Sequence, residues 1–180
     1  MSLESKEDHL VSHELLLKSD KILFITHLAI GDFTYMQNYF KALHEKYPNL
    51  KIDLLVDEGR GKSFFRRWKK TKLGILDHWL TSTKYFDKIY KNTGSRSQLK
   101  YFIQDAQKEN YPIVVSLGTI NSHRYARYAR SVSKNGYVVG VSQKFKWFNF
   151  IKKISLKKFD KFLFWDDLHD KTNKHITNTY

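Results

Sequence analysis

Short apolar runs alternate along the chain with longer segments that carry apolar residues at helical spacing. Buried parallel strands are continuous apolar runs of about four to eight residues. We therefore expect strands at 21–26, 51–56, 88–90, 113–117, 137–141 and 162–165. Helices are predicted between them at 33–47, 98–110 and 121–133, together with a helical segment over 60–80 that is interrupted at Gly74. This alternation predicts the α/β class, with a doubly wound parallel sheet.

The chain shows no break in composition that would divide it into several folding units. Its 180 residues include 2 prolines and 8 glycines, with no linker rich in these residues, no repeat and no low-complexity tract. We expect one domain over 20–167, preceded by a tail or leading helix at 1–19.

The charge balance is strongly basic, with 32 Lys and Arg against 18 Asp and Glu and a net charge of +14. Such an excess favours a polyanionic partner: nucleic acid, an anionic membrane face, or a phosphorylated or carboxylated substrate. The absence of cysteine excludes a disulfide scaffold, a thiol nucleophile and cysteine-based metal sites. No apolar run approaches the roughly 18 residues of a membrane span, and the acidic N-terminus is unlike a secretory signal. We expect a cytoplasmic protein.

The loop after the first predicted strand, at 26–32, holds the first candidate site residues. In doubly wound sheets, ligands bind beyond the carboxyl ends of the strands. This loop has one glycine, Gly31, in place of the three of a dinucleotide fingerprint, so a nicotinamide or flavin cofactor is not supported. Asp32 follows at the start of a predicted helix. Its carboxylate suits a general base that accepts a proton from a hydroxyl, or alternatively a helix N-cap.

Two further loops carry cations that could meet an anionic substrate. The segment after the second strand has basic residues interleaved with aromatic ones, and its alternative role is a solvated helix face. The loop after the fourth strand contains Gly118 and leads into a helix start, which attracts anions. There, arginines and tyrosines could equally be surface packing. The histidines show no metal-ligand spacing, so a metal site is not supported. The candidate substrate-binding residues are Arg60, Lys62, Arg66 and Arg67 in the first segment, and Gly118, His123 and Arg124 in the second.

The segment 144–159 combines six lysines and five aromatic residues with no acidic residue. Wound as a helix, it places its apolar residues on one side and lysines elsewhere, as a helix at a membrane interface does. The alternative is an ordinary amphipathic helix that docks on the sheet. The expected membrane contacts are Trp147, Phe148, Lys152 and Lys153, with Ile151 and Ile154 on the same apolar side.

Three stretches resemble, in order and spacing, the opening of the ADP-heptose:lipopolysaccharide heptosyltransferases, glycosyltransferase family 9. They are KILFITHLAIGD at 21–32, FKAL at 40–43 and YPNLKIDLLVDE at 47–58. Later, NYPIVV at 110–115, Gly118 and HITNTY at 175–180 are similar to the rest of that family's N-terminal half and the start of its interdomain connection.

The resemblance implies a GT-B glycosyltransferase whose Rossmann-like N-terminal half binds the acceptor. Residues 20–167 would be that half and 168–180 the start of the connection, while the domain that binds the donor, ADP-heptose, is missing from this chain. It implies an inverting, metal-independent enzyme without a cofactor. Asp32 would deprotonate the acceptor hydroxyl, with His27 and Gly31 beside it. The basic groups would meet the phosphates and carboxylates of the inner lipopolysaccharide core, at the cytoplasmic face of the inner membrane.

The sequence departs from this family at two places. The family's Asp-x-Gln-Gly after the fourth strand is replaced by the residues from Val115 to Gly118, and Asn38 and Tyr39 stand near the usual proline of the first helix. Two alternatives without catalysis remain. One is a basic nucleic-acid-binding module, although no recognition-helix, RNP or zinc-finger pattern supports it; the other is a peripheral membrane-binding module.

Overall fold

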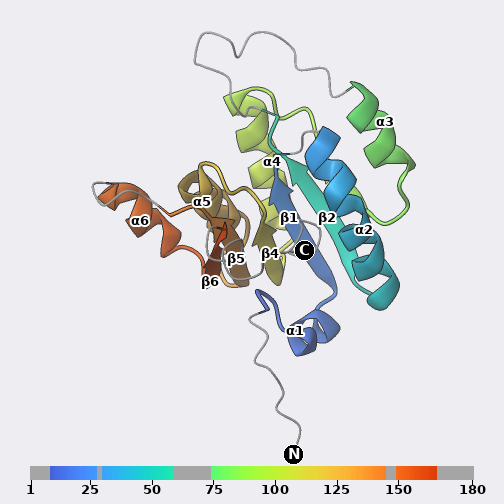
Figure 1. The fold of residues 1–180 in the computed structure, drawn as a ribbon, viewed down its shortest axis with the longest axis horizontal. Helices are drawn as coiled ribbons and strands as arrows, with labels where there is room; N and C mark the ends of the chain where they lie inside the picture. Colours follow the sequence, from blue (N-terminus) through green and yellow to red (C-terminus); the bar gives the residue numbers. More distant parts are fainter. Residues whose placement is uncertain (1–8, 28–29, 59–73, 145–148, 166–180) are drawn as a thin grey trace, which may run out of the picture.

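Six parallel strands form one sheet in the order β3-β2-β1-β4-β5-β6 (Figure 1). The computed structural model describes residues 9–27, 30–58, 74–144 and 149–165, and only the backbone for 30–32 and 74–76. The strands are β1 (Lys21–Thr26), β2 (Lys51–Val56), β3 (Lys88–Tyr90), β4 (Ile113–Ser116), β5 (Tyr137–Ser142) and β6 (Lys161–Phe164). All six coincide with the predicted apolar runs to within one residue at each end, so the predicted doubly wound α/β fold is confirmed.

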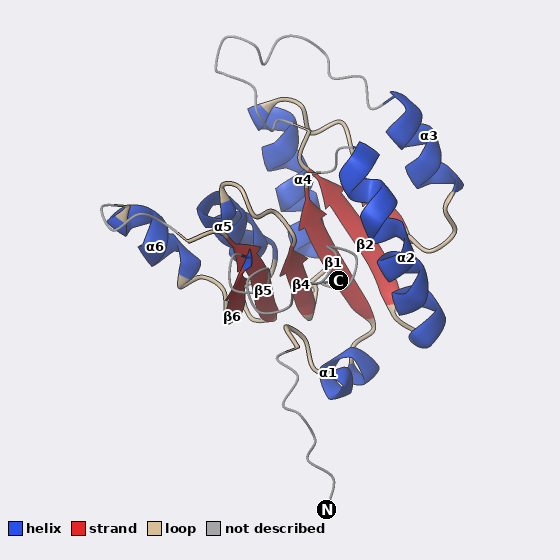
Figure 2. Cartoon of the chain, viewed as in Figure 1, coloured by secondary structure: helices blue, strands red, loops and turns tan. Residues whose placement is uncertain are grey.

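Helices cover both faces of this sheet (Figure 2). They are α1 (His13–Lys18), α2 (Ile30–Lys46), α3 (Gly74–Ser82), α4 (Arg96–Lys108), α5 (Ser122–Val132) and α6 (Phe150–Leu156). Alternate strand residues feed two cores, as the two-residue period of a strand requires. Phe24 of β1 packs with Phe40 of α2 on one face, whereas Ile25 packs with Ala129 of α5 on the other.

The helix boundaries differ from the predicted ones for identifiable reasons. Helix α4 begins two residues early because Ser95 and Gln98 form a reciprocal capping box. Helix α3 begins at Gly74, the position of the predicted interruption, and ends at Ser82, whereas the part of the predicted segment from 60 to 73 lies outside the described residues. Helix α1 lies within the segment 1–19, for which a tail or leading helix was predicted, and residues 1–8 of that segment lie outside the described part. The segment 144–159 forms only the seven-residue α6, with residues 145–148 outside the described part. In the described ranges, no helix has the length and apolar character to cross a bilayer.

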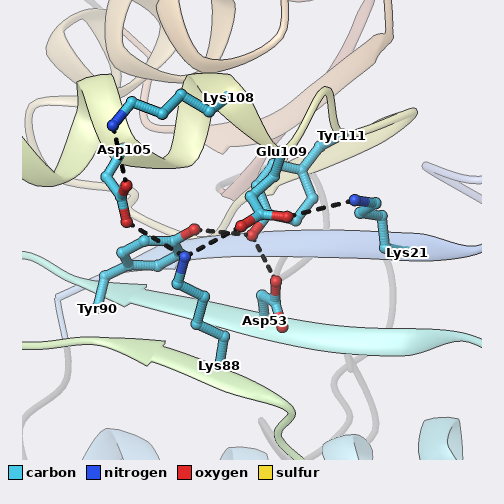
Figure 3. Close-up of polar contacts among 8 residues, drawn as sticks. All are labelled: Lys21, Asp53, Lys88, Tyr90, Asp105, Lys108, Glu109 and Tyr111. Atoms are coloured by element: carbon cyan, nitrogen blue, oxygen red, sulfur yellow. Dashed lines mark hydrogen bonds and ion pairs between the residues drawn. The ribbon is translucent and has the colours of Figure 1, made fainter.

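A buried polar network joins the middle of β2 to β3 and α4 (Figure 3). The Tyr111 hydroxyl donates to Asp53 Oδ2 and lies 3.1 Å from the Tyr90 hydroxyl. Burial raises the pKa of Asp53, although the bond from Tyr111 opposes that rise. Lys88 binds Glu109 at 3.1 Å and Asp105 at 3.2 Å, and these hydrogen bonds lower the pKa of both carboxyls. This network holds the amino-terminal part of the sheet against the end of α4.

The short strand β3 is extended on its upstream side by the residue before it. The Asp87 amide donates to the Ile52 carbonyl at 2.9 Å, and Asp87 Oδ2 accepts from the Ile52 amide at 2.9 Å. Main chain and side chain of one aspartate therefore complete the hydrogen bonds of β2 where β3 has not yet begun.

Candidate functional site

The connection of the strands changes direction between β1 and β4, which is the switch point where ligands bind in such sheets. Three residues stand just beyond the carboxyl ends of the strands here: His27 after β1, Asp57 after β2 and Gly118 after β4. All three are buried. A buried histidine and a buried aspartate at this edge define the candidate site.

Tyr125 of α5 connects these residues. Its hydroxyl donates a hydrogen bond of 3.0 Å to Asp57 Oδ2. Its ring stacks on the imidazole of His27, with centroids 6.0 Å apart and planes inclined by 22°. Asp57 therefore fixes the position of the tyrosine, and the tyrosine ring fixes the plane of His27.

The glycine at 118 makes this arrangement sterically possible. A Cβ built on Gly118 would lie 2.5 Å from two carbons of the Tyr125 ring. Any side chain there would displace a ring that is itself buried and hydrogen-bonded. Gly118, predicted as a substrate-binding residue, thus shapes the site through its contact with Tyr125.

The start of α5 is held at the same edge of the sheet. The Ser122 hydroxyl lies 2.7 Å from that of Ser142 at the end of β5, and Asn121 takes a left-handed conformation with φ 60°. Burial disfavours the charge of Arg124, but its 3.1 Å bond to the Tyr128 hydroxyl and the charge of Asp57 hold its pKa above the ordinary value. Arg124 also lines a groove of about 570 Å³ between α4 and α5.

His123 lies among cations at this helix start. Burial lowers its pKa, and the positive charges of Lys152, Arg127 and Arg124 lower it further. Its imidazole is therefore neutral at neutral pH. In the unfolded chain this imidazole has the ordinary histidine pKa of about 6.5, so on acidification it binds a proton before the folded protein does. The folded state therefore loses stability as the pH falls below about 6.5.

Replacing Lys152 with glutamine is expected to raise the pKa of His123, because one nearby positive charge disappears. An NMR titration of the imidazole Cε1 proton measures this directly. Lys153→Gln is the matched control, since the neighbouring Lys153 is exposed and is not among the charges acting on His123. Equal shifts in the two variants would show that Lys152 has no special proximity to His123.

Asp32 and Gly31 lie in the first turn of α2, directly beyond the end of β1. The helix begins at Ile30, which makes Asp32 its third residue, so the alternative role of N-cap does not hold for it. The next residue, Phe33, is buried in the core on this face of the sheet. The side chains of residues 30–32 are outside the described part.

The remaining predicted residues divide into two groups. Lys152 is half-buried beside the start of α5, whereas Lys153 is exposed on α6. The others lie outside the described residues; they are Arg60, Lys62, Arg66, Arg67, Trp147 and Phe148.

Two residues of the site were not predicted from the sequence. Asp57 is not among the predicted site residues, although an aspartate directly after a buried strand is a signal for this edge. Tyr125 had been assigned either to the anion-binding helix start or to surface packing, and the second assignment is wrong because its side chain is buried. The signal for Tyr125 is its spacing with Ala129 and Val132 on one face of a polar helix. Within the described ranges, no group of three or more potential ligands could hold a metal ion.

The strand order and the helices on both faces define a Rossmann-like α/β domain. Among solved structures, the chain is similar to a glycosyl transferase of family 9 from Veillonella parvula DSM 2008, with a TM-score of 0.60 and 16% sequence identity. The match covers 89% of this chain and 39% of that protein, so the chain spans well under half of that protein's length. The sequence matches no protein-family model and no curated protein. The likeness shows a shared fold.

Proposed function

We propose that this chain is the acceptor-binding half of a glycosyltransferase of the family 9 type. The observation that carries the proposal is the linked set of Asp57, Tyr125 and His27 at the switch point of a fold shared with a family 9 glycosyl transferase. The resemblance of residues 21–58 to that family's opening supports it independently. The donor, an ADP-sugar such as ADP-heptose, would be bound by a second domain.

In the proposed reaction, a hydroxyl of the acceptor attacks the anomeric carbon of the donor sugar. The bond from that carbon to the phosphate oxygen breaks, ADP leaves, and the configuration inverts. Asp32 accepts the hydroxyl proton, a role that needs a carboxylate and no metal ion. Its place in the first turn after β1 puts its backbone next to the edge where His27 lies.

The proposed acceptor is the anionic inner core of a lipopolysaccharide. The cations at the start of α5 support this choice, because guanidinium and ammonium groups pair with phosphate and carboxylate oxygens. Arg124 and Arg127 contribute two charges there, and Lys152 a third. The neutral imidazole of His123 adds a hydrogen-bonding group without further charge. Tyr125 acts by positioning His27 rather than by touching the acceptor.

The chain alone suffices to test acceptor binding, by calorimetric titration with a phosphorylated inner-core oligosaccharide. We expect binding that weakens with salt, and weaker binding of the same glycan after its phosphates are removed. Tyr125→Phe keeps the ring but removes the bond to Asp57, and is expected to weaken binding about tenfold.

Tyr101→Phe is the control for this titration, because Tyr101 is exposed on α4. Equal binding of the charged and uncharged glycans would contradict the proposal. Tighter, salt-sensitive binding of a single-stranded oligonucleotide would instead assign the basic surface to nucleic acid.

A further inference from the structure

Helix α6 presents large apolar side chains to solvent. Phe150 is 68% exposed, Ile151 82% and Ile154 48%, and the first two are more exposed than any other large apolar residue in the described part of the chain. They are adjacent on a helix with 3.6 residues per turn, so they form one surface. We call these three residues the α6 apolar face.

This face does not attach α6 to the rest of the fold. The opposite side of the segment does so, through the buried Leu156 and Phe159. Phe159 lies so close to β5 that a Cβ on Gly140 would be 2.4 Å from its ring. The side of the segment that carries Leu156 and Phe159 packs on the sheet, whereas the α6 apolar face takes no part in the core.

Exposed lysines lie beside the α6 apolar face. Lys153 and Lys157 lie one turn apart on its flank, and Lys158 follows. The segment 144–159 has no acidic residue. Apolar side chains flanked by lysines suit the interface of an anionic bilayer, where the apolar groups enter the headgroup region and the cations meet lipid phosphates. A second copy of the same face would bring like charges together.

Helix α6 also lies close to the candidate site, through the side opposite its apolar face. Lys152, in the same helix, is near enough to His123 for its charge to act on that imidazole. In Figure 1, α6 projects from the edge of the molecule beside α5, the helix that carries Tyr125.

We propose that the α6 apolar face and its lysines dock this protein on an anionic lipid bilayer. The docked helix lies in the plane of the interface and does not cross the membrane. Binding to vesicles needs neither donor nor acceptor, so this proposal and the proposed function can fail separately.

Cosedimentation of the whole chain with vesicles tests the apolar contribution. Vesicles of phosphatidylcholine mixed with phosphatidylglycerol are expected to bind the protein, and phosphatidylcholine alone much less. The double variant Ile151→Ser/Ile154→Ser keeps every charge and is expected to lower the partition coefficient about tenfold. Leu17→Ser/Tyr101→Ser is the control, because both residues are exposed on other helices.

A charge-reversed pair tests the lysines. Lys153→Glu/Lys157→Glu is expected to lower binding to the anionic vesicles about 25-fold or more, since each lysine at the surface contributes about fivefold. Lys51→Glu/Lys84→Glu changes the net charge equally at exposed positions away from α6, and should have a far smaller effect.

Undiminished binding by the serine double variant would overturn the proposal. Equal losses of vesicle binding in Lys153→Glu/Lys157→Glu and Lys51→Glu/Lys84→Glu would also overturn it, because the net charge alone would then explain the binding. Sedimentation velocity provides the third readout: self-association that Ile151→Ser/Ile154→Ser abolishes, with vesicle binding unchanged, would assign the face to a second copy of the chain.

Discussion

Replacing Asp32 with asparagine is expected to lower sugar transfer by about 10²- to 10⁴-fold when this chain is joined to a domain that binds the donor. The amide has nearly the shape of the carboxylate but does not accept the hydroxyl proton. Transfer of radiolabelled sugar from the ADP-sugar to the acceptor measures the loss. Acceptor binding by the same variant should change little, because the effect lies in the chemical step.

Asp20→Asn is the control for this experiment. Asp20 is exposed and precedes β1, whereas Asp32 follows that strand, so the two aspartates lie toward opposite edges of the sheet. Unchanged turnover in Asp32→Asn would remove this residue from the mechanism, and Asp57 would then be the next carboxylate to test at that edge.

Replacing Tyr111 with phenylalanine is expected to lower the free energy of unfolding by about 3 kcal/mol. The change removes the donor to Asp53 Oδ2, which is buried in the middle of β2, and removes the partner of the Tyr90 hydroxyl. Urea unfolding followed by circular dichroism measures the loss. Asp53→Asn should cost less, because a neutral amide oxygen still accepts from Tyr111.

The stability that Tyr111→Phe loses should depend on pH in a defined direction. Burial raises the pKa of Asp53, so its protonated form stabilises the fold, and that contribution is lost as the pH rises through the raised pKa. Without the bond from Tyr111, which lowers this pKa, the rise becomes larger. The deficit of Tyr111→Phe is therefore expected to shrink as the pH falls toward about 4. A stability deficit that is the same at about pH 7 and about pH 4 would show that Asp53 does not ionise at neutral pH.

Most of the sheet could be predicted because buried parallel strands are apolar on both faces. The run from Ile113 to Ser116 has no other plausible place than the interior. Helix boundaries were less accurate where side-chain capping decides them, as for α4, although Ser95 and Gln98 carry the signal in the sequence. The pairing of Asp53 with Tyr111 joins residues 58 positions apart, and no local pattern reveals it.

The candidate site was predicted in part for the same reason. His27, Gly118, His123 and Arg124 follow strand ends, a position that the sequence shows, and the fold brings them to one edge. The role of Tyr125 depends on the rotation of α5 and on Asp57, which lies 68 positions away. A contact of that kind is fixed by the packing of the core and not by the segment that contains it.

The outer edge of β3 has a consequence for the protein in concentrated solution. An unpaired strand edge is a template for a strand of another chain, and natural proteins protect such edges by keeping them short and charged. Here the edge strand has three residues, and its Lys88 is bound to Asp105 of α4 and to Glu109 at the end of that helix. Asp87 already uses its main chain and side chain on β2. A strand of another chain therefore pairs poorly with β3, and this edge of the sheet does not favour ordered aggregation.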